Sequence, residues 1–203
     1  MVATACIQVG VAVTVDADGT GTIKAEIAIS DALVGFADAF ADDDSPDICE
    51  QLLDTSDLPS GAVLTPRSGD GWCRASYTLP FRNFDLSETE EDGEMGLRLW
   101  KEAERVYFEM DISELGSDGS EEMSFEEVMA MAEAFDLEIP EPKMTIEVTL
   151  PGAPLNHNAD STSGSTFGWD VDLVGGDSRT TLHASADTSV ATSDSSIFLI
   201  VIV

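Results

Sequence analysis

The sequence predicts an α+β fold, in which two or three helices pack on a mostly antiparallel sheet of about seven or eight strands. Three observations carry this prediction. Segments in which apolar and polar residues alternate recur along the chain, as in half-buried strands. Serine residues stand before segments with helical spacing of apolar residues. Hydrophobic residues make up 43% of the 203 residues, which is enough for a packed core.

The predicted strands are short and are bounded by glycine, proline and small polar residues. Their apolar positions recur with a period of two, so each strand buries one face. Neighbouring strands are expected to pair as hairpins across the turns 16–21, 102–104 and 175–177. The first turn begins like a calcium loop, but Ile27 stands where an EF-hand needs glutamate. The strands are predicted over 7–15, 22–29, 71–81, 95–101, 105–112, 144–150, 166–173 and 180–186.

The predicted helices each follow a serine, whose hydroxyl satisfies free backbone N–H groups at a helix start. Ser30 precedes an amphipathic segment over 31–40, and Ser45 precedes a short one that ends near residue 53. The third helix is predicted over 125–135, where apolar residues recur at helical spacing.

An apolar cavity is possible between the sheet and the third helix. Aromatic and methionine side chains give such a space an adaptable wall. The candidate lining residues are Phe108, Met110, Phe125, Met129 and Phe135. Alternatively, the same side chains fill an ordinary core.

The chain is strongly acidic, with 40 Asp and Glu residues against 9 Lys and Arg residues and a formal net charge of −31. Such a surface repels phosphate backbones, which excludes nucleic acid as a partner. Anionic lipid headgroups are repelled as well, unless a basic site or bound cations intervene. A surface adapted to high salt explains the charge most simply, and a calcium-dependent role or a basic partner is the alternative.

The chain has three cysteines, so one of them stays unpaired if the other two form a disulfide. The simplest partition pairs Cys49 with Cys73 and leaves Cys6 for another role. Two buried thiols in a reducing cytosol are the alternative.

Both ends of the chain suggest a membrane. Residues 1–6 read like a lipoprotein cleavage site, so that Cys6 would be acylated, although a charged and apolar leader does not precede it. Cys6 is otherwise an ordinary strand residue. At the other end, a polar linker over 188–196 leads into the apolar residues 197–203, read as the start of a truncated transmembrane helix or as a terminal strand. The domain itself then spans 7–187.

The sequence contains no recognisable catalytic centre. His157 and His183 are its only histidines, and neither stands in a spacing that builds a zinc site. Phosphate-binding and nucleophile-elbow motifs are absent. We therefore predict a protein that is not an enzyme and that carries neither a cofactor nor a metal.

The order of the segments resembles the LppM-type lipoprotein domain of actinobacterial envelopes. The resemblance runs from Cys6 and the strand that follows it, through 79–81, to the run 149–156 and the strand that carries Trp169. It implies an exported domain on the extracytoplasmic face of the cell membrane, held there by a lipid or a C-terminal helix. It also implies a hydrophobic cavity that binds phosphatidylinositol mannosides. The acylation candidate Cys6 and the fold-marking residues Pro151, Gly152, Asn156 and Trp169 carry over by position.

Two functions follow as expectations. The first is a membrane-anchored envelope domain that binds or senses a membrane lipid or glycolipid in an apolar cavity. The second is a structural or interaction module of the envelope that contacts other envelope proteins and binds no small ligand. A secreted hydrolase, with a cysteine and a histidine as its catalytic pair, is a distant third because no constellation supports it.

Overall fold

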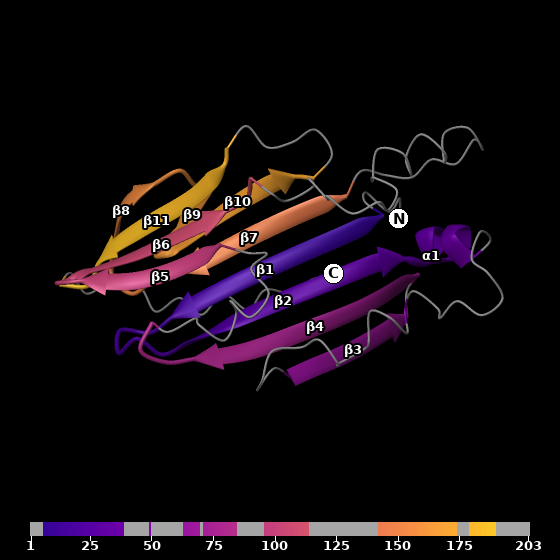
Figure 1. Ribbon diagram of the computed structural model, residues 1–203, viewed down its shortest axis with the longest axis horizontal. Helices are drawn as coiled ribbons and strands as arrows, with labels where there is room; N and C mark the ends of the chain where they lie inside the picture. The colour runs from indigo at the N-terminus through magenta and orange to yellow at the C-terminus, as the bar shows by residue number, and fades with distance from the viewer. Residues whose placement is uncertain are drawn as a thin grey trace.

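The structure is a computed structural model that describes residues 6–38, 49, 63–69, 71–84, 96–113, 142–173 and 179–189. These residues form two β sheets and one short helix (Figure 1). The elements are β1 (Ile7–Val15), β2 (Gly21–Ser30), α1 (Asp31–Asp38), β3 (Val63–Gly69), β4 (Trp72–Phe81), β5 (Leu97–Glu102), β6 (Arg105–Asp111), β7 (Lys143–Thr149), β8 (Ala153–His157), β9 (Ser161–Ser163), β10 (Thr166–Asp172) and β11 (Thr181–Asp187).

The larger sheet has seven strands in the order β3-β4-β2-β1-β7-β10-β9. Its neighbours are antiparallel except for β1 and β7, which run parallel and lie far apart in the sequence. In the register, Val11 stands between Ala25 on β2 and Ile146 on β7. Residues opposite one another project to the same face, so this row points into the core and the next row points outward.

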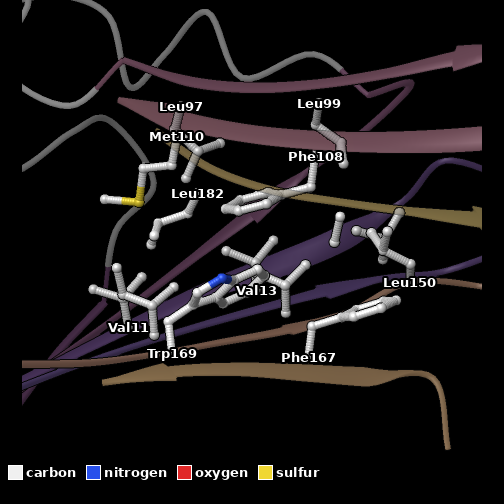
Figure 2. Close-up of a cluster of buried hydrophobic side chains, with 14 of the residues drawn as sticks. Val11, Val13, Leu97, Leu99, Phe108, Met110, Leu150, Phe167, Trp169 and Leu182 are labelled. Carbon is white, nitrogen blue, oxygen red and sulfur yellow. The ribbon is translucent and has the colours of Figure 1, made fainter. Parts of the chain in front are cut away.

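The smaller sheet has four antiparallel strands in the order β5-β6-β11-β8. Its inner face packs on the inner face of the larger sheet and forms one core (Figure 2). The Phe108 ring on β6 lies 5.8 Å from the Trp169 ring on β10, measured between centroids. The core draws on both sheets and includes Val11, Val13, Ile146, Val148, Phe167 and Trp169 from the larger one and Leu97, Leu99, Phe108, Met110 and Leu182 from the smaller one.

The predicted α+β fold is wrong, because the described residues are mostly β and form two packed sheets with a single short helix. Alternation correctly showed strands with one buried face, but among the described residues that face packs against a second sheet. The predicted helix over 45–53, apart from Cys49, and the predicted helix over 125–135 lie outside the described residues.

The predicted hairpin between 166–173 and 180–186 is also wrong. β10 pairs with β7 and β9, whereas β11 pairs with β6 and β8 in the other sheet. The two strands instead face each other across the core, where the alternate residues Phe167 and Trp169 of β10 and Leu182 and Ala184 of β11 are buried. Alternation looks the same whether two strands lie side by side or face to face.

The first hairpin and the first helix confirm the local predictions. β1 and β2 pair from Ile7 opposite Ile29 to Val15 opposite Gly21. A side chain at Gly21 would overlap the Phe81 ring, which explains the glycine there. In the turn, the Thr20 N–H and hydroxyl donate to the Asp18 carboxylate and lower its pKa. The Ser30 hydroxyl accepts a hydrogen bond from the Leu33 N–H at 3.3 Å and caps α1.

The predicted disulfide between Cys49 and Cys73 is confirmed. Cys73 is buried on β4, where it stands opposite Ile29 of β2. The bridge therefore ties Cys49 to the larger sheet.

Reduction of this disulfide is expected to lower the free energy of unfolding by about 3 kcal/mol, because it closes a loop of 24 residues in the unfolded chain. Urea denaturation with and without dithiothreitol measures the change. The Cys49→Ala, Cys73→Ala double variant is the control, since the reductant should leave its midpoint unchanged. An equal shift in both proteins contradicts the prediction.

Candidate ligand groove on the four-stranded sheet

The outer face of the smaller sheet carries an unusual set of residues. Because side chains alternate along a strand, the neighbours of the core residues point away from the sandwich. One outward row has Trp100 on β5, Tyr107 on β6 and Ser185 on β11, and the next includes Glu109 and His183. Aromatic side chains on an outward row stand out in a chain with only 7% aromatic residues.

These residues line a surface groove of about 440 Å³. The Trp100 and Tyr107 rings stack with their centroids 5.1 Å apart and their planes 10° apart. Leu155 of β8, whose exposed fraction of 45% is high for a leucine, borders the groove. The polar lining residues are Arg105, Glu109, Asn156, His183 and Ser185. Such a mixture of aromatic surface and a few polar groups is typical of small-molecule sites.

The wall made by β8 is fixed by Ser185. Its hydroxyl donates to the Asn156 carbonyl oxygen and accepts from the Asn156 N–H, both at 3.1 Å. The pairing of β8 with β11 is irregular between Ala184 and Ala186, and the Ser185 hydroxyl replaces the missing backbone partners there. These two hydrogen bonds hold Leu155 and Asn156 beside the aromatic pair.

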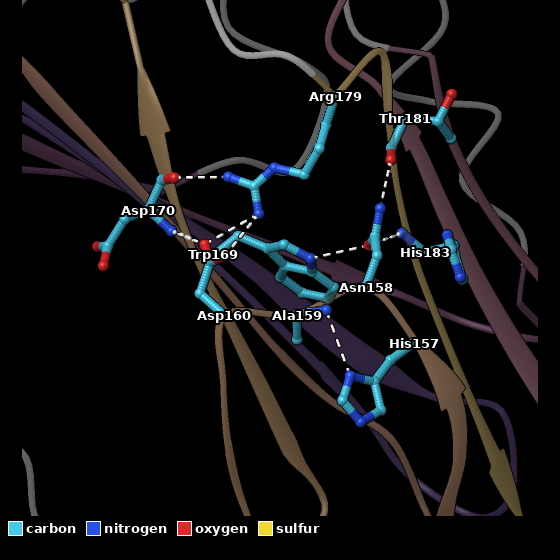
Figure 3. A network of polar contacts seen from close by, with 9 residues as sticks. All are labelled: His157, Asn158, Ala159, Asp160, Trp169, Asp170, Arg179, Thr181 and His183. Atoms are coloured by element: carbon cyan, nitrogen blue, oxygen red, sulfur yellow. Dashed lines mark hydrogen bonds and ion pairs between the residues drawn. The ribbon is translucent and has the colours of Figure 1, made fainter.

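Behind the groove, Asn158 links the two sheets (Figure 3). Its side-chain oxygen accepts from the Trp169 indole N–H at 3.0 Å and from the His183 N–H at 2.9 Å. Its side-chain NH₂ donates to the Thr181 carbonyl oxygen at 2.8 Å. Because Trp169 belongs to the larger sheet and β11 to the smaller, these bonds set how the groove strands sit on the core.

A second polar cluster adjoins Asn158. The Arg179 guanidinium contacts both carboxylate oxygens of Asp160 at 2.9 Å and donates to the Asp170 carbonyl oxygen at 2.8 Å. The Asp160 carboxylate also accepts from the Asp170 N–H at 2.9 Å. The cluster joins the start of β11 to β10, so its role is structural.

Two of the predicted cavity residues lie inside the sandwich. Phe108 and Met110 are 1% and 0% exposed and pack in the core between the sheets. Phe125, Met129 and Phe135 lie outside the described residues. The groove was missed at the sequence level, although a signal existed: Trp100 and Tyr107 stand at the outward positions of strands whose inward positions are already apolar.

Cys6 lies immediately before β1, and its side chain is 1% exposed. Its carbonyl oxygen accepts a hydrogen bond from the Ser30 N–H at 2.8 Å. Burial raises the pKa of its thiol. The structure thus places Cys6 against the end of β2, and its acylation stays a prediction.

A second groove, of about 490 Å³, runs over the outer face of the larger sheet. Small residues of β1 and β2 form its floor, and its sides carry charges of both signs: Lys24, Glu26, Lys143 and Glu147. It has no aromatic lining residue, so it offers less to a small ligand than the aromatic groove does.

Within the described part of the chain, no three His, Cys, Asp or Glu side chains gather as metal ligands do. The same part contains no helix with the length and apolar character needed to cross a membrane.

Comparisons with known proteins give one consistent result. The sequence model of the LppM domain matches residues 8–188. The fold is similar to the NMR structure of the folded domain of LppM from Mycobacterium tuberculosis, with a TM-score of 0.51, 14% sequence identity and 91% of each chain covered. No curated protein matches the chain in sequence. Because the family model covers most of its length, the chain belongs to the LppM domain family.

Proposed function

We propose that this domain is a cell-envelope module without catalytic activity that binds a membrane lipid or glycolipid. Membership of the LppM family fits an envelope module. The observation that supports ligand binding is the groove on the smaller sheet, where the stacked pair Trp100 and Tyr107 lies beside an exposed leucine and several hydrogen-bonding groups.

The proposed site is the groove rather than the space between the sheets. Phe108 and Met110 have almost no exposed surface and contact other core side chains. A ligand between the sheets would have to separate them and displace the Phe108–Trp169 contact. Binding in the groove requires no such separation of the sheets, because Trp100, Tyr107 and Leu155 of its lining are already partly exposed.

The proposal includes anchoring on the extracytoplasmic face of the cell membrane, through an acylated Cys6, through a helix that begins in 197–203, or through both. The Cys49–Cys73 disulfide supports export, because such bridges persist in oxidising compartments. Residues 197–203 lie outside the described residues. Mass spectrometry of the protein extracted from membranes tests Cys6 directly, since acylation adds the mass of its fatty chains.

Vesicle binding tests the function. The full chain is expected to sediment with phosphatidylcholine vesicles that carry a neutral galactolipid. Leu155→Ser should lower the apparent affinity about fivefold, because burying the exposed part of a leucine contributes roughly 1 kcal/mol. Val63→Ser is the matched control: Val63 is another exposed aliphatic residue, 62% exposed, but it lies on β3 of the other sheet. Absent binding, or equal losses in both variants, contradicts the proposal.

A structural or interaction module without a small ligand is the second candidate. It is favoured by β3, which stands at the end of the strand order among the described residues and exposes Val63. Such an edge offers backbone groups to a strand of a partner protein. In this case Val63→Ser should weaken the capture of an envelope protein, and the chain should not bind vesicles.

A further inference from the structure

We infer that the outer face of the larger sheet is a self-association surface, on which a second copy of this chain packs face to face to form a homodimer. This inference goes beyond the proposed function and does not depend on it, because the surface lies on the other sheet. It stands on three observations: the groove over β1, the charges on either side of that groove, and the symmetry of their arrangement.

β1 forms a low strip along the middle of this face, with β2 and β4 on one side and β7 and β10 on the other (Figure 1). Its outward residues Gln8, Gly10 and Ala12 lie on the floor of the groove of about 490 Å³. The packing of the described residues does not require the glycine, because a Cβ atom at Gly10 would meet only the Thr145 hydroxyl oxygen, at an ordinary 3.8 Å. Glycine weakens the interior of a strand and often marks a close approach of another backbone. A second sheet can therefore come close along β1.

The two sides of this strip carry different charges. On the side of β2 and β4, two cations and one acid point outward, and on the side of β7 and β10, three acids and one cation do. These residues are Lys24, Glu26 and Arg74 on the first side and Lys143, Glu147, Asp170 and Asp172 on the second. The face thus has three cations to four acids, whereas the whole chain has 9 to 40. Two copies can meet here with less mutual repulsion than the composition of the chain suggests.

A twofold axis along β1 makes the two sides complementary. Such an axis lays β1 of one copy over β1 of the other in the same direction, and it lays β2 and β4 over β7 and β10 of the second copy. Every residue then keeps its own level along the strands, and the register of the sheet gives these levels.

The levels bring opposite charges together. Lys24 of one copy faces Glu147 of the other, because both stand opposite Ala12 of β1. Arg74 and Asp172 face each other in the same way, four residues further along the strands. The axis repeats each contact, so two kinds of ion pair occur twice in the dimer.

The remaining outward charges do not meet like charges. Glu26 faces Thr145 of the second copy, and Asp170 faces Ser76, so a hydroxyl group lies over each carboxylate. A twofold axis across the strands through Gly10 would instead place Glu26 on Glu26 and Asp170 on Asp170. The axis along β1 avoids both of these repulsive contacts.

The area of the face predicts a weak dimer. Five strands of about seven residues measure about 24 by 23 Å at the spacings of a β sheet. Two copies would bury about 1,100 Å² in total, slightly less than the roughly 1,200 Å² at which stable complexes begin. We therefore expect a reversible dimer with a micromolar Kd.

Analytical ultracentrifugation of the whole chain at about 5 to 500 μM tests the inference. About 0.5 M NaCl screens the repulsion between the remaining acidic surfaces more than it screens the partly buried pairs of the interface. The sedimentation coefficient should rise with concentration from that of a monomer to that of a dimer. A monomer at every concentration overturns the inference and leaves a different protein as the occupant of this face.

Single charge reversals locate the contact. Lys24→Glu should raise the dimer Kd at least about tenfold, because carboxylates then face each other at two places in the dimer. Glu147→Lys should do the same through two pairs of ammonium groups. Both side chains are exposed, so the monomer should keep its fold, which circular dichroism checks. Lys101→Glu is the matched control: it changes the net charge equally but lies exposed on β5 of the smaller sheet, so the Kd should change less than about twofold.

An equimolar mixture of the Lys24→Glu and Glu147→Lys variants tests the symmetry. In a heterodimer about the axis along β1, the introduced glutamate faces the introduced lysine, and the original Glu147 faces the original Lys24. The mixture should therefore dimerise with a Kd within about threefold of that of the original chain, although neither variant does so alone. Both variants stay strongly acidic, so a general attraction between opposite net charges cannot produce this recovery. No recovery in the mixture overturns the inference, and so does an equal loss in Lys24→Glu and Lys101→Glu.

Discussion

Trp169→Ala is expected to lower the free energy of unfolding by about 3–5 kcal/mol, the cost of removing a large aromatic residue from a core. The Trp169 side chain is 2% exposed and lies between the sheets, with its ring centroid 5.8 Å from that of Phe108 and 6.4 Å from that of Phe167. The facing sheets cannot close the resulting cavity without breaking strand pairing on both sides. Urea denaturation followed by circular dichroism measures the loss.

The control for this prediction is Trp72→Ala. Trp72 is half-buried on the outward side of β4, where Arg74 covers its ring at 5.5 Å. Removing the Trp72 side chain leaves an open surface rather than a closed cavity. We therefore expect the free energy of unfolding to fall by only about 1 kcal/mol. Similar costs for the two variants would show that Trp169 is not the centre of the sheet-to-sheet packing.

Asn158→Ala is expected to lower the free energy of unfolding by about 3–4 kcal/mol. The substitution removes three side-chain hydrogen bonds, to the Trp169 indole, the His183 N–H and the Thr181 carbonyl oxygen. Each partner is partly shielded from water, and leaving such a group unsatisfied costs about 1–3 kcal/mol. Urea denaturation gives the stability. The NMR signal of the Trp169 indole N–H should also move, because its acceptor is gone.

Asn156→Ala serves as the control for Asn158. Asn156 lies two residues away in the same stretch, but its bonds to Ser185 use only backbone atoms. Its replacement should change the free energy of unfolding by no more than about 0.5 kcal/mol. A larger effect at Asn156 than at Asn158 contradicts the role given to the Asn158 side chain.

The signals that predicted structure correctly were local. Alternation and a glycine turn defined β1 and β2, and the short bend at 102–104 defined the pairing of β5 with β6. Ser30 marked the start of α1. In each case the residues that interact are neighbours in the sequence, so a pattern of a few residues contains the whole interaction. The resemblance to the LppM family, carried by the order of such segments, is confirmed.

The parts that the sequence did not reveal depend on distant residues. The parallel pairing of β1 with β7 joins residues more than a hundred positions apart, and no turn links them. The separation of β10 and β11 into different sheets has no local mark either. The disulfide is an intermediate case: the pairing followed from the small number of cysteines, whereas the position of Cys73 opposite Ile29 of β2 came from the structure.

By itself, the sequence predicted the strands β1, β2, β4, β5, β6, β7, β10 and β11 and their apolar faces, and it showed that the chain is acidic and lacks a recognisable catalytic motif. The strands β3, β8 and β9 were not among those predicted. Only the tertiary structure decided what covers the apolar faces. Apolar residues at every second position show that one face of a strand is buried, but not what buries it. The free energy gained per unit of buried apolar area is nearly the same against a sheet as against a helix. The groove follows from that decision, because Trp100 and Tyr107 become a surface pair only once Leu99 and Phe108 face the second sheet.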